Sequence, residues 1–171
     1  MPGKLGRDSQ HRLAMLKNQA SALLWYGKIE TTKAKAKEVR SYVEKVITLA
    51  INSYQDTIQT EKVITKKTGK KEQEVTVTVV KDGAKKLAAR RRIMSKLNDL
   101  QEIKEFNESK SAYKARTKDI NHPLVEKLFN EIAPKYAQRN EEKNCGGGYT
   151  RIIPMQIRRG DATQMAILEL V

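Results

Sequence analysis

The chain has 171 residues, of which 39% are hydrophobic and 5% aromatic, so it is long enough for one domain with a modest core. Its formal charge of +14 and isoelectric point near 9.9 are typical of a protein that binds a polyanion, and nucleic acid is the first candidate. The longest apolar stretches, such as 22–26 and 47–51, are far shorter than a bilayer span, which excludes a membrane-spanning segment.

The single cysteine and the first residues bear on disulfides, metal sites and secretion. Cys145 excludes an intrachain disulfide and cannot by itself supply a thiolate-rich zinc site, so we interpret it as a reduced loop residue and expect no metal or cofactor. The first residues contain neither a continuous apolar segment nor an evident cleavage site. We therefore expect a cytoplasmic protein without a secretory signal.

The positive charge is concentrated in the first two thirds of the chain. Residues 1–52 contain 10 Lys and Arg against 4 Asp and Glu, and residues 53–120 contain 17 against 10. Residues 121–171 contain 7 against 6. We expect the basic surface on the first two segments and a scaffolding role for the third, apart from its arginines.

The first element is predicted to be an extended basic arm at residues 1–8, because two glycines and a proline oppose regular structure there. Asp8 or Ser9 can cap a helix over about 9–26, in which leucines and alanines follow at helical spacing, and Gly27 supplies its stop. Its polar face carries donors suited to phosphate and ribose, although a solvated face explains the last two equally well: His11, Arg12, Asn18 and Gln19.

A short strand is predicted at residues 28–30, between two helix boundaries. Thr31 or Thr32 then caps a second helix that runs to about residue 51. This helix has one stripe of valine and alanine and another of lysine and arginine, so we expect it to bury one face and expose the other.

Residues 53–82 are predicted to contain a protruding hairpin. The alternating β-branched run at 75–80 predicts a strand, its expected partner is 62–65, and the turn at 66–71 places basic residues at the tip. Gly69-Lys70 does not form a phosphate-binding loop, because the preceding glycine of that motif is absent and Lys71 replaces its Ser or Thr.

A third helix is predicted to start at Asp82 or Gly83 and to continue through Leu100. It carries three consecutive arginines that spread over most of the helical circumference, so at least one must face outward. Since the whole chain is basic, we favour phosphate contact over a merely solvated face for this cluster of Arg90, Arg91 and Arg92.

The last third begins after a polar stretch at 107–121, which is predicted to be a linker or irregular loop. Asn121 is expected to cap the next helix, Pro123 lies in its first turn, and Pro134 is expected to end it.

Two strands are predicted to close the chain, at 149–157 and 165–171, after a glycine-rich turn at 146–148. Pro154 lacks a ladder donor and therefore needs an edge position or a bulge. The connection at 158–161 contains Arg-Gly-Asp, which we interpret as a hairpin turn rather than an adhesion motif.

The sequence offers no arrangement suited to catalysis. The two histidines, His11 and His122, fall on separate predicted helices without a metal-binding pattern, and the acidic residues are scattered among lysines. We therefore expect no enzymatic activity and no small-molecule substrate.

Several blocks of residues occur in an order known from one protein family, among them Lys4-Leu5-Gly6-Arg7, Ile29-Glu30-Thr31-Thr32, Gly147-Gly148-Tyr149-Thr150-Arg151-Ile152 and Arg159-Gly160-Asp161. In these blocks the chain resembles bacterial ribosomal protein L17 over about 3–50, 87–100 and 122–171. The resemblance implies an α+β, two-layer α/β domain with a helix, a short strand, three helices and two C-terminal strands in a small mixed sheet. Residues 53–82 and 101–121 look like insertions into this single 1–171 domain.

The same resemblance implies a structural constituent of the large ribosomal subunit, where the protein stabilises large-subunit ribosomal RNA beside neighbouring large-subunit proteins. A non-ribosomal nucleic-acid-binding protein of nucleoid or RNA-chaperone type is the alternative, because it shares the charge. Tyr149 either stacks on an unpaired base or covers the core. Together with the arginine cluster, the implied RNA-binding residues are Lys4, Arg7, His11, Arg12, Lys35, Lys37, Arg139, Tyr149, Arg151, Arg158 and Arg159.

Overall fold

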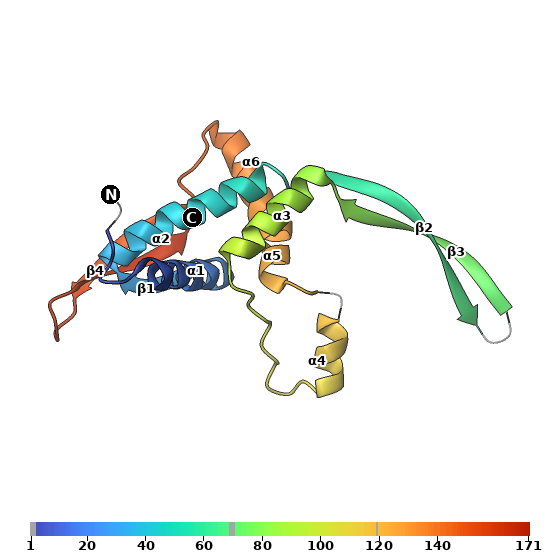
Figure 1. Ribbon diagram of the computed structural model, residues 1–171, viewed down its shortest axis with the longest axis horizontal. Coiled ribbons are helices and arrows are strands. Elements are labelled where there is room, and N and C mark those ends of the chain that lie inside the picture. The colour runs from blue at the N-terminus through green and yellow to red at the C-terminus, as the bar shows by residue number, and fades with distance from the viewer. Residues whose placement is uncertain (1–2, 69–70, 119) are drawn as a thin grey trace.

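The computed structural model describes residues 3–68, 71–118 and 120–171. It is an α+β domain with a helical layer on a small sheet and a long hairpin that projects from one end (Figure 1). In chain order the elements are α1 (Ser9–Tyr26), β1 (Lys28–Thr32), α2 (Lys33–Ile51), β2 (Thr57–Thr68), β3 (Lys71–Asp82), α3 (Ala84–Lys96), α4 (Lys110–Thr117), α5 (Pro123–Lys127), the π-helical turn η1 (Leu128–Ile132), α6 (Ala133–Lys143), β4 (Thr150–Ile157) and β5 (Gln164–Leu170).

The main sheet has the order β1-β5-β4 and is antiparallel throughout, whereas the family resemblance implied a mixed sheet. The first strand crosses to the far side of β5 and runs opposite to it, with Glu30 beside Ile167. Pro154 lies on the edge strand β4 next to a shift in register between Pro154 and Ile157, as its missing donor requires.

The core lies between the inner face of this sheet and the helices. Helix α2 is its centre, because it contacts α1, α3, α6, β4 and β5. Each fully buried aliphatic side chain contributes about 1.5–3 kcal/mol, so this packing outweighs the weak intrinsic preferences of the elements. Fully buried members include Leu23, Leu24, Val39, Val43, Val46, Ile47, Ile93, Leu128 and Leu168.

The first helix begins and ends where the sequence predicted. The Asp8 side chain accepts a hydrogen bond from the backbone N–H of His11, and Gly27 closes the helix at φ 80°. The preceding segment is not an extended arm as predicted, because Arg7 N–H donates to the Lys4 carbonyl at 3.1 Å in a tight turn. Leu5 of this turn packs against the core, and that burial holds the turn to the body.

The third helix ends at Lys96, one turn earlier than predicted. Its last carbonyl accepts a hydrogen bond from the Tyr42 hydroxyl at 2.7 Å, and the backbone N–H of Asn98 donates to Ser21 Oγ at 2.8 Å. Leu97 therefore reaches the core from an extended backbone, and its apolar spacing imitates one more helical turn.

The segment after α3 was predicted to be irregular, but it contains α4. Ser109 caps this helix by accepting a hydrogen bond from Ala112 N–H at 3.1 Å. None of its residues is buried, so it has no apolar stripe from which periodicity could predict it.

The helical run from Pro123 to Lys143 corrects two further predictions. His122, and not Asn121, is the residue before the first turn, and Pro134 does not end the helix. The π-helical turn η1 explains the proline: Ala133 N–H bonds to the Leu128 carbonyl five residues back, so the missing donor of Pro134 falls where the ladder changes register.

The hairpin β2–β3 is longer than predicted. Residues 75–80 pair with 59–64 instead of 62–65, and the strands extend from Thr57 to Thr68 and from Lys71 to Asp82. A two-stranded ribbon needs only main-chain pairing, so polar residues without an alternating pattern also join it. The predicted turn at 66–71 is thereby shortened, and its centre at 69–70 lies outside the described residues.

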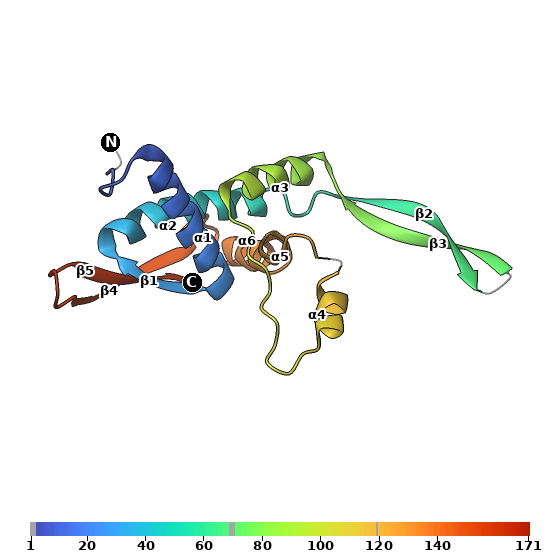
Figure 2. The same ribbon diagram turned by 60° about the horizontal axis from the view of Figure 1, so that its bottom comes forward.

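The base of the hairpin holds α3 in place. The Asp56 carboxylate accepts from the backbone N–H groups of Lys85 at 2.8 Å and Lys86 at 3.3 Å, and so caps α3 from outside the helix. Gly83 makes room for this carboxylate, because a Cβ there would lie 2.4 Å from it. The base of the hairpin is therefore part of the packed domain, whereas the rest of the ribbon projects away from it (Figure 2).

We expect the projecting ribbon to be dispensable for folding. If residues 58–80 are replaced by a short glycine-serine loop that keeps Asp56 and Asp82, the cooperative thermal transition of the purified protein should persist. The free-energy cost of closing the loop changes by only about 0.6 kcal/mol per twofold change in loop length, so the shorter loop should not prevent folding. As a matched control, Asp56→Ala in the full chain should cost about 1 kcal/mol through the lost cap. An excised protein without a cooperative transition would place the ribbon in the folding core.

Candidate nucleic-acid interface

Cationic side chains gather at the end of the molecule that carries the N-terminus. Figures 1 and 2 both place the start of the chain, the start of α2 and the β4–β5 turn at this end, opposite the hairpin β2–β3. Lys4, Lys37 and Arg159 are exposed here. We call this region the arm end. It brings together candidates that lie more than 100 residues apart in sequence.

One face of α2 extends the cationic surface away from the arm end. Lys33, Lys37 and Lys45 are all exposed on this helix; Lys37 lies one turn after Lys33, and Lys45 lies two turns after Lys37. We call these three residues the lysine stripe. The same face forms a shallow groove lined by Lys37, Arg40, Ser41, Glu44, Lys45 and Thr48. The basic side of this helix was predicted from the sequence, but Lys45 was missed as a candidate, although its spacing from Lys37 predicts it.

The Glu44 carboxylate in this groove is already occupied. It accepts a hydrogen bond from Thr150 Oγ1 at 2.9 Å and lies 3.4 Å from Arg40 Nε. Glu44 therefore neutralises part of the charge of Arg40 and leaves the lysine stripe as the dominant charge of the groove.

Arg12, a candidate on α1, is engaged inside the protein. It pairs with Glu38 of α2 at 2.5 Å, and only 21% of its side chain is exposed. The neighbouring His11 is exposed, and its ring lies 3.8 Å from Asp8. Arg12 thus joins two helices, whereas His11 remains accessible to a ligand.

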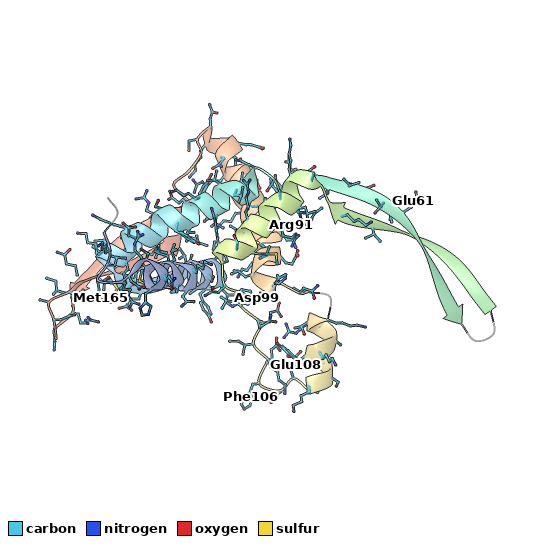
Figure 3. The ribbon with its side chains drawn as sticks, viewed as in Figure 1. Glu61, Arg91, Asp99, Phe106, Glu108 and Met165 are labelled. Carbon is cyan, nitrogen blue, oxygen red and sulfur yellow. The ribbon has the colours of Figure 1, made fainter. Side chains whose placement is uncertain are left out.

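The arginine cluster on α3 divides into one internal and two external residues. Arg90 donates to Asp82 at 2.5 Å and to Glu126 at 2.5 Å, and its guanidinium lies 5.2 Å from the centre of the Phe129 ring. Arg91 and Arg92 are exposed and form no ion pair among the residues that the structure describes; Figure 3 labels Arg91 on this helix. The prediction that at least one arginine faces outward is confirmed for these two.

The titration of Asp82 reflects this internal role. Burial alone would raise the pKa of its carboxyl, but hydrogen bonds and charges from Arg90 and Lys86 outweigh burial and hold the pKa below its usual value. The Asp82 carboxylate is therefore ionised at neutral pH and fastens the hairpin base to α3.

Tyr149 is a core residue, and its burial favours the core interpretation over base stacking. Only 3% of it is exposed, its ring lies 5.0 Å from that of Tyr136, and its hydroxyl accepts a hydrogen bond from Asn140 Nδ2 at 3.1 Å. Arg139 covers both rings at 5.3 Å and donates to the carbonyls of Gly147 at 2.5 Å and Gly148 at 3.2 Å. This cluster fastens α6 to the start of β4. Neither Tyr149 nor Arg139 therefore presents a free face on which a base could stack.

The remaining candidates lie on the C-terminal strands and on α2. Arg151 lies 3.6 Å from Glu169 on the neighbouring strand, and Arg158 bonds Asp161 within the turn, with 2.9 Å between Nε and Oδ1. This hydrogen bond lowers the pKa of Asp161 and raises that of Arg158. Lys35 is half-buried, and Arg7 is half-buried in the N-terminal turn.

The candidate side chains are suited to binding a polyanion and not to catalysing a reaction. Within the described part of the chain no group of three or more His, Cys, Asp or Glu could hold a metal ion. No helix among these residues is long and apolar enough to cross a membrane. The surface instead presents ammonium and guanidinium groups over several elements, an arrangement that binds phosphates by position rather than by base sequence.

Comparison with known proteins places this geometry in context. The family model described as Ribosomal protein L17 matches residues 15–171. The chain is 42% identical over 184 residues to the large ribosomal subunit protein bL17 of Lachnospira eligens, with 98% of this chain and 97% of the relative covered. It is 41% identical over 195 residues to bL17 of Ruminiclostridium cellulolyticum, with both chains covered completely. It is 40% identical over 168 residues to bL17 of Sulfurimonas denitrificans, with 98% and 93% covered.

Proposed function

Because the chain belongs to the ribosomal protein L17 family, we propose that it is a structural constituent of the bacterial large ribosomal subunit and binds its ribosomal RNA. Exposed cations on the arm end and on the lysine stripe of α2 carry the proposal, since they are spread over a surface and fit phosphates. Its partners are large-subunit ribosomal RNA and neighbouring large-subunit proteins. Its location is the cytoplasm, because bacterial ribosomes are cytoplasmic. The L17 family is structural, and we propose no catalytic role.

The proposed RNA contacts fall into two groups. The arm-end group combines sequence candidates with the α2 stripe, and the α3 group lies beside the hairpin base. Most of these side chains contact phosphate or sugar, because the deep major groove of folded RNA is closed to them. The proposed residues are Lys4, Arg7, His11, Lys33, Lys35, Lys37, Lys45, Arg151, Arg158 and Arg159 in the first group, and Arg91 and Arg92 in the second.

Four sequence candidates receive a structural role in this proposal. Arg12 and Arg90 pair with carboxylates of the protein, and only 21% and 18% of their side chains are exposed. Arg139 donates to the carbonyls of Gly147 and Gly148, and Tyr149 is buried. Moving any of these four to RNA would leave a partner unsatisfied, at a cost of about 1–3 kcal/mol. Arg151 and Arg158 are also paired, but 61% and 56% of their side chains remain exposed, so they stay among the proposed contacts.

Sucrose-gradient sedimentation of a cell lysate at moderate salt tests the proposal. A tagged copy of the chain should migrate with the large subunit. In competition with wild type, Lys37→Glu with Lys45→Glu should reduce occupancy of the subunit by roughly tenfold, since two phosphate contacts become repulsive.

The matched control for this experiment is Lys135→Glu with Lys143→Glu, two exposed lysines on α6 at the same spacing. This control pair should leave occupancy close to that of wild type. A chain that stays at the top of the gradient would instead support a nucleic-acid-binding protein outside the ribosome.

A further inference from the structure

Residues 101–118 form a small lobe that hangs away from the helical core, as Figures 1 and 2 show from two directions. Its order comes from its own polar contacts. Arg116 of α4 binds Glu108 with two hydrogen bonds of 3.1 and 3.2 Å and also pairs with Glu102. The Tyr113 hydroxyl donates to the Glu102 carbonyl at 2.8 Å, so the loop is fastened to α4 at two points.

This bracing leaves two large apolar side chains in solvent. Phe106 is 101% exposed and Ile103 is 75% exposed, so neither contributes packing energy to the fold. Figure 3 places Phe106 at the end of the lobe farthest from α1, α3 and the main sheet. A fully exposed aromatic ring on a braced loop is held ready to contact something outside the chain.

The net charge of the lobe indicates what that partner is. Lys104, Lys110, Lys114 and Lys118 of the lobe are all exposed. Glu102 and Glu108 are paired with Arg116, whereas Glu105 is exposed, so residues 101–118 carry five Lys and Arg against three Glu. The pairing with Arg116 holds the pKa of the Glu108 carboxyl below its usual value, so this carboxylate stays ionised and bound. Lysine is depleted at the cores of protein–protein interfaces, but RNA phosphates attract it.

We propose that this lobe is a separate ribosomal RNA-binding element, in which Phe106 stacks on an unpaired base and the surrounding lysines contact the flanking phosphates. Single-stranded loops and bulges offer such bases, and an aromatic side chain accepts any of them because every base has a flat face. The ring provides stacking without a hydrogen bond to the base edge, so the site recognises an accessible base rather than a sequence. This inference rests on the proposed function and adds a second, separate contact to it.

Acylation of RNA 2′-hydroxyls in purified large subunits tests the inference, because it reports how freely each nucleotide moves. In subunits that carry Phe106→Ala, one unpaired nucleotide should gain reactivity several-fold over wild type. Stacking on a side chain is worth roughly 5- to 150-fold in a local equilibrium. Lys110→Ala with Lys114→Ala should produce a weaker gain at nucleotides next to it.

Conservative variants separate a stacked base from an apolar pocket. Phe106→Tyr and Phe106→Trp should restore protection, and Phe106→Leu, which is apolar but lacks a flat ring, should not. Full protection by Phe106→Leu would overturn the inference in favour of a pocket on a neighbouring protein. The Phe106 side chain is fully exposed, so all four variants should keep the thermal midpoint of wild type.

The outcomes also separate this inference from the proposed function. If the chain sediments with the large subunit but Phe106→Ala changes no nucleotide, the lobe inference is wrong and the proposed function stands. If the wild-type chain is missing from the large subunit, both fail together.

Discussion

The purified chain is expected to lose roughly three decades of affinity for a large-subunit RNA fragment when salt rises from 50 to 200 mM. Each phosphate neutralised by a lysine or arginine releases condensed counterions, and about six such contacts produce this slope. Filter binding or fluorescence titration over a salt series measures the effect. The net charge of +14 and the exposed lysines of α2 are its physical basis.

The salt slope also locates the interface on the protein. Lys37→Gln with Lys45→Gln should reduce the slope by about two, one for each phosphate that is no longer neutralised. Lys135→Gln with Lys143→Gln removes the same charge from α6 and should leave the slope almost unchanged. Equal slopes for both pairs would show that the α2 stripe is not part of the interface, and a flat response of the wild-type protein would contradict phosphate binding altogether.

Leu168→Ala should destabilise the protein by about 2–5 kcal/mol, the largest effect on stability that we expect from one substitution. Leu168 is fully buried on β5, the central strand, which pairs with β1 and β4 and packs against α2. Removing its side chain opens a cavity between the sheet and the helix that supports the lysine stripe. Chemical denaturation followed by circular dichroism measures the loss.

The control for this substitution is Ile157→Ala on the edge strand β4, where 58% of the residue is exposed. Its free energy of unfolding should stay within about 0.5 kcal/mol of wild type. A small effect of Leu168→Ala, comparable with this control, would mean that the sheet and α2 do not share one core.

Local signals in the sequence predicted the helices well where caps and apolar spacing coincide. Asp8 and Gly27 delimit α1 because a cap acts within one turn of its own residue. The same reasoning placed Pro134 at a helix end, yet the π-helical turn before it absorbs the missing donor. A register change of this kind depends on how Leu128, Phe129 and Ile132 pack in the core. Rules for caps and prolines consider only neighbouring residues and therefore do not predict it.

Site residues were predicted from charge and resemblance, and their roles then diverged. Arg90 and Arg91 are neighbours in sequence with the same side chain, but one is bound by Asp82 and Glu126 and the other is exposed. The exposed Phe106 was missed because a lone aromatic in a polar stretch has no periodic signal. Its exposure depends on the ion pairs of Arg116, which order the lobe without burying this ring.

The sequence by itself determined the charge of the protein, its uneven distribution, the bounds of α1 and α2 and the resemblance to its family, because composition, caps and motifs are local properties. Only the tertiary structure decided which cations remain available to RNA. Arg12 meets Glu38 across 26 residues, and Arg90 meets Glu126 across 36. The strength of such a pair depends on a distance of a few ångströms that the chain sets by packing α1, α2, α3 and α5 around one core.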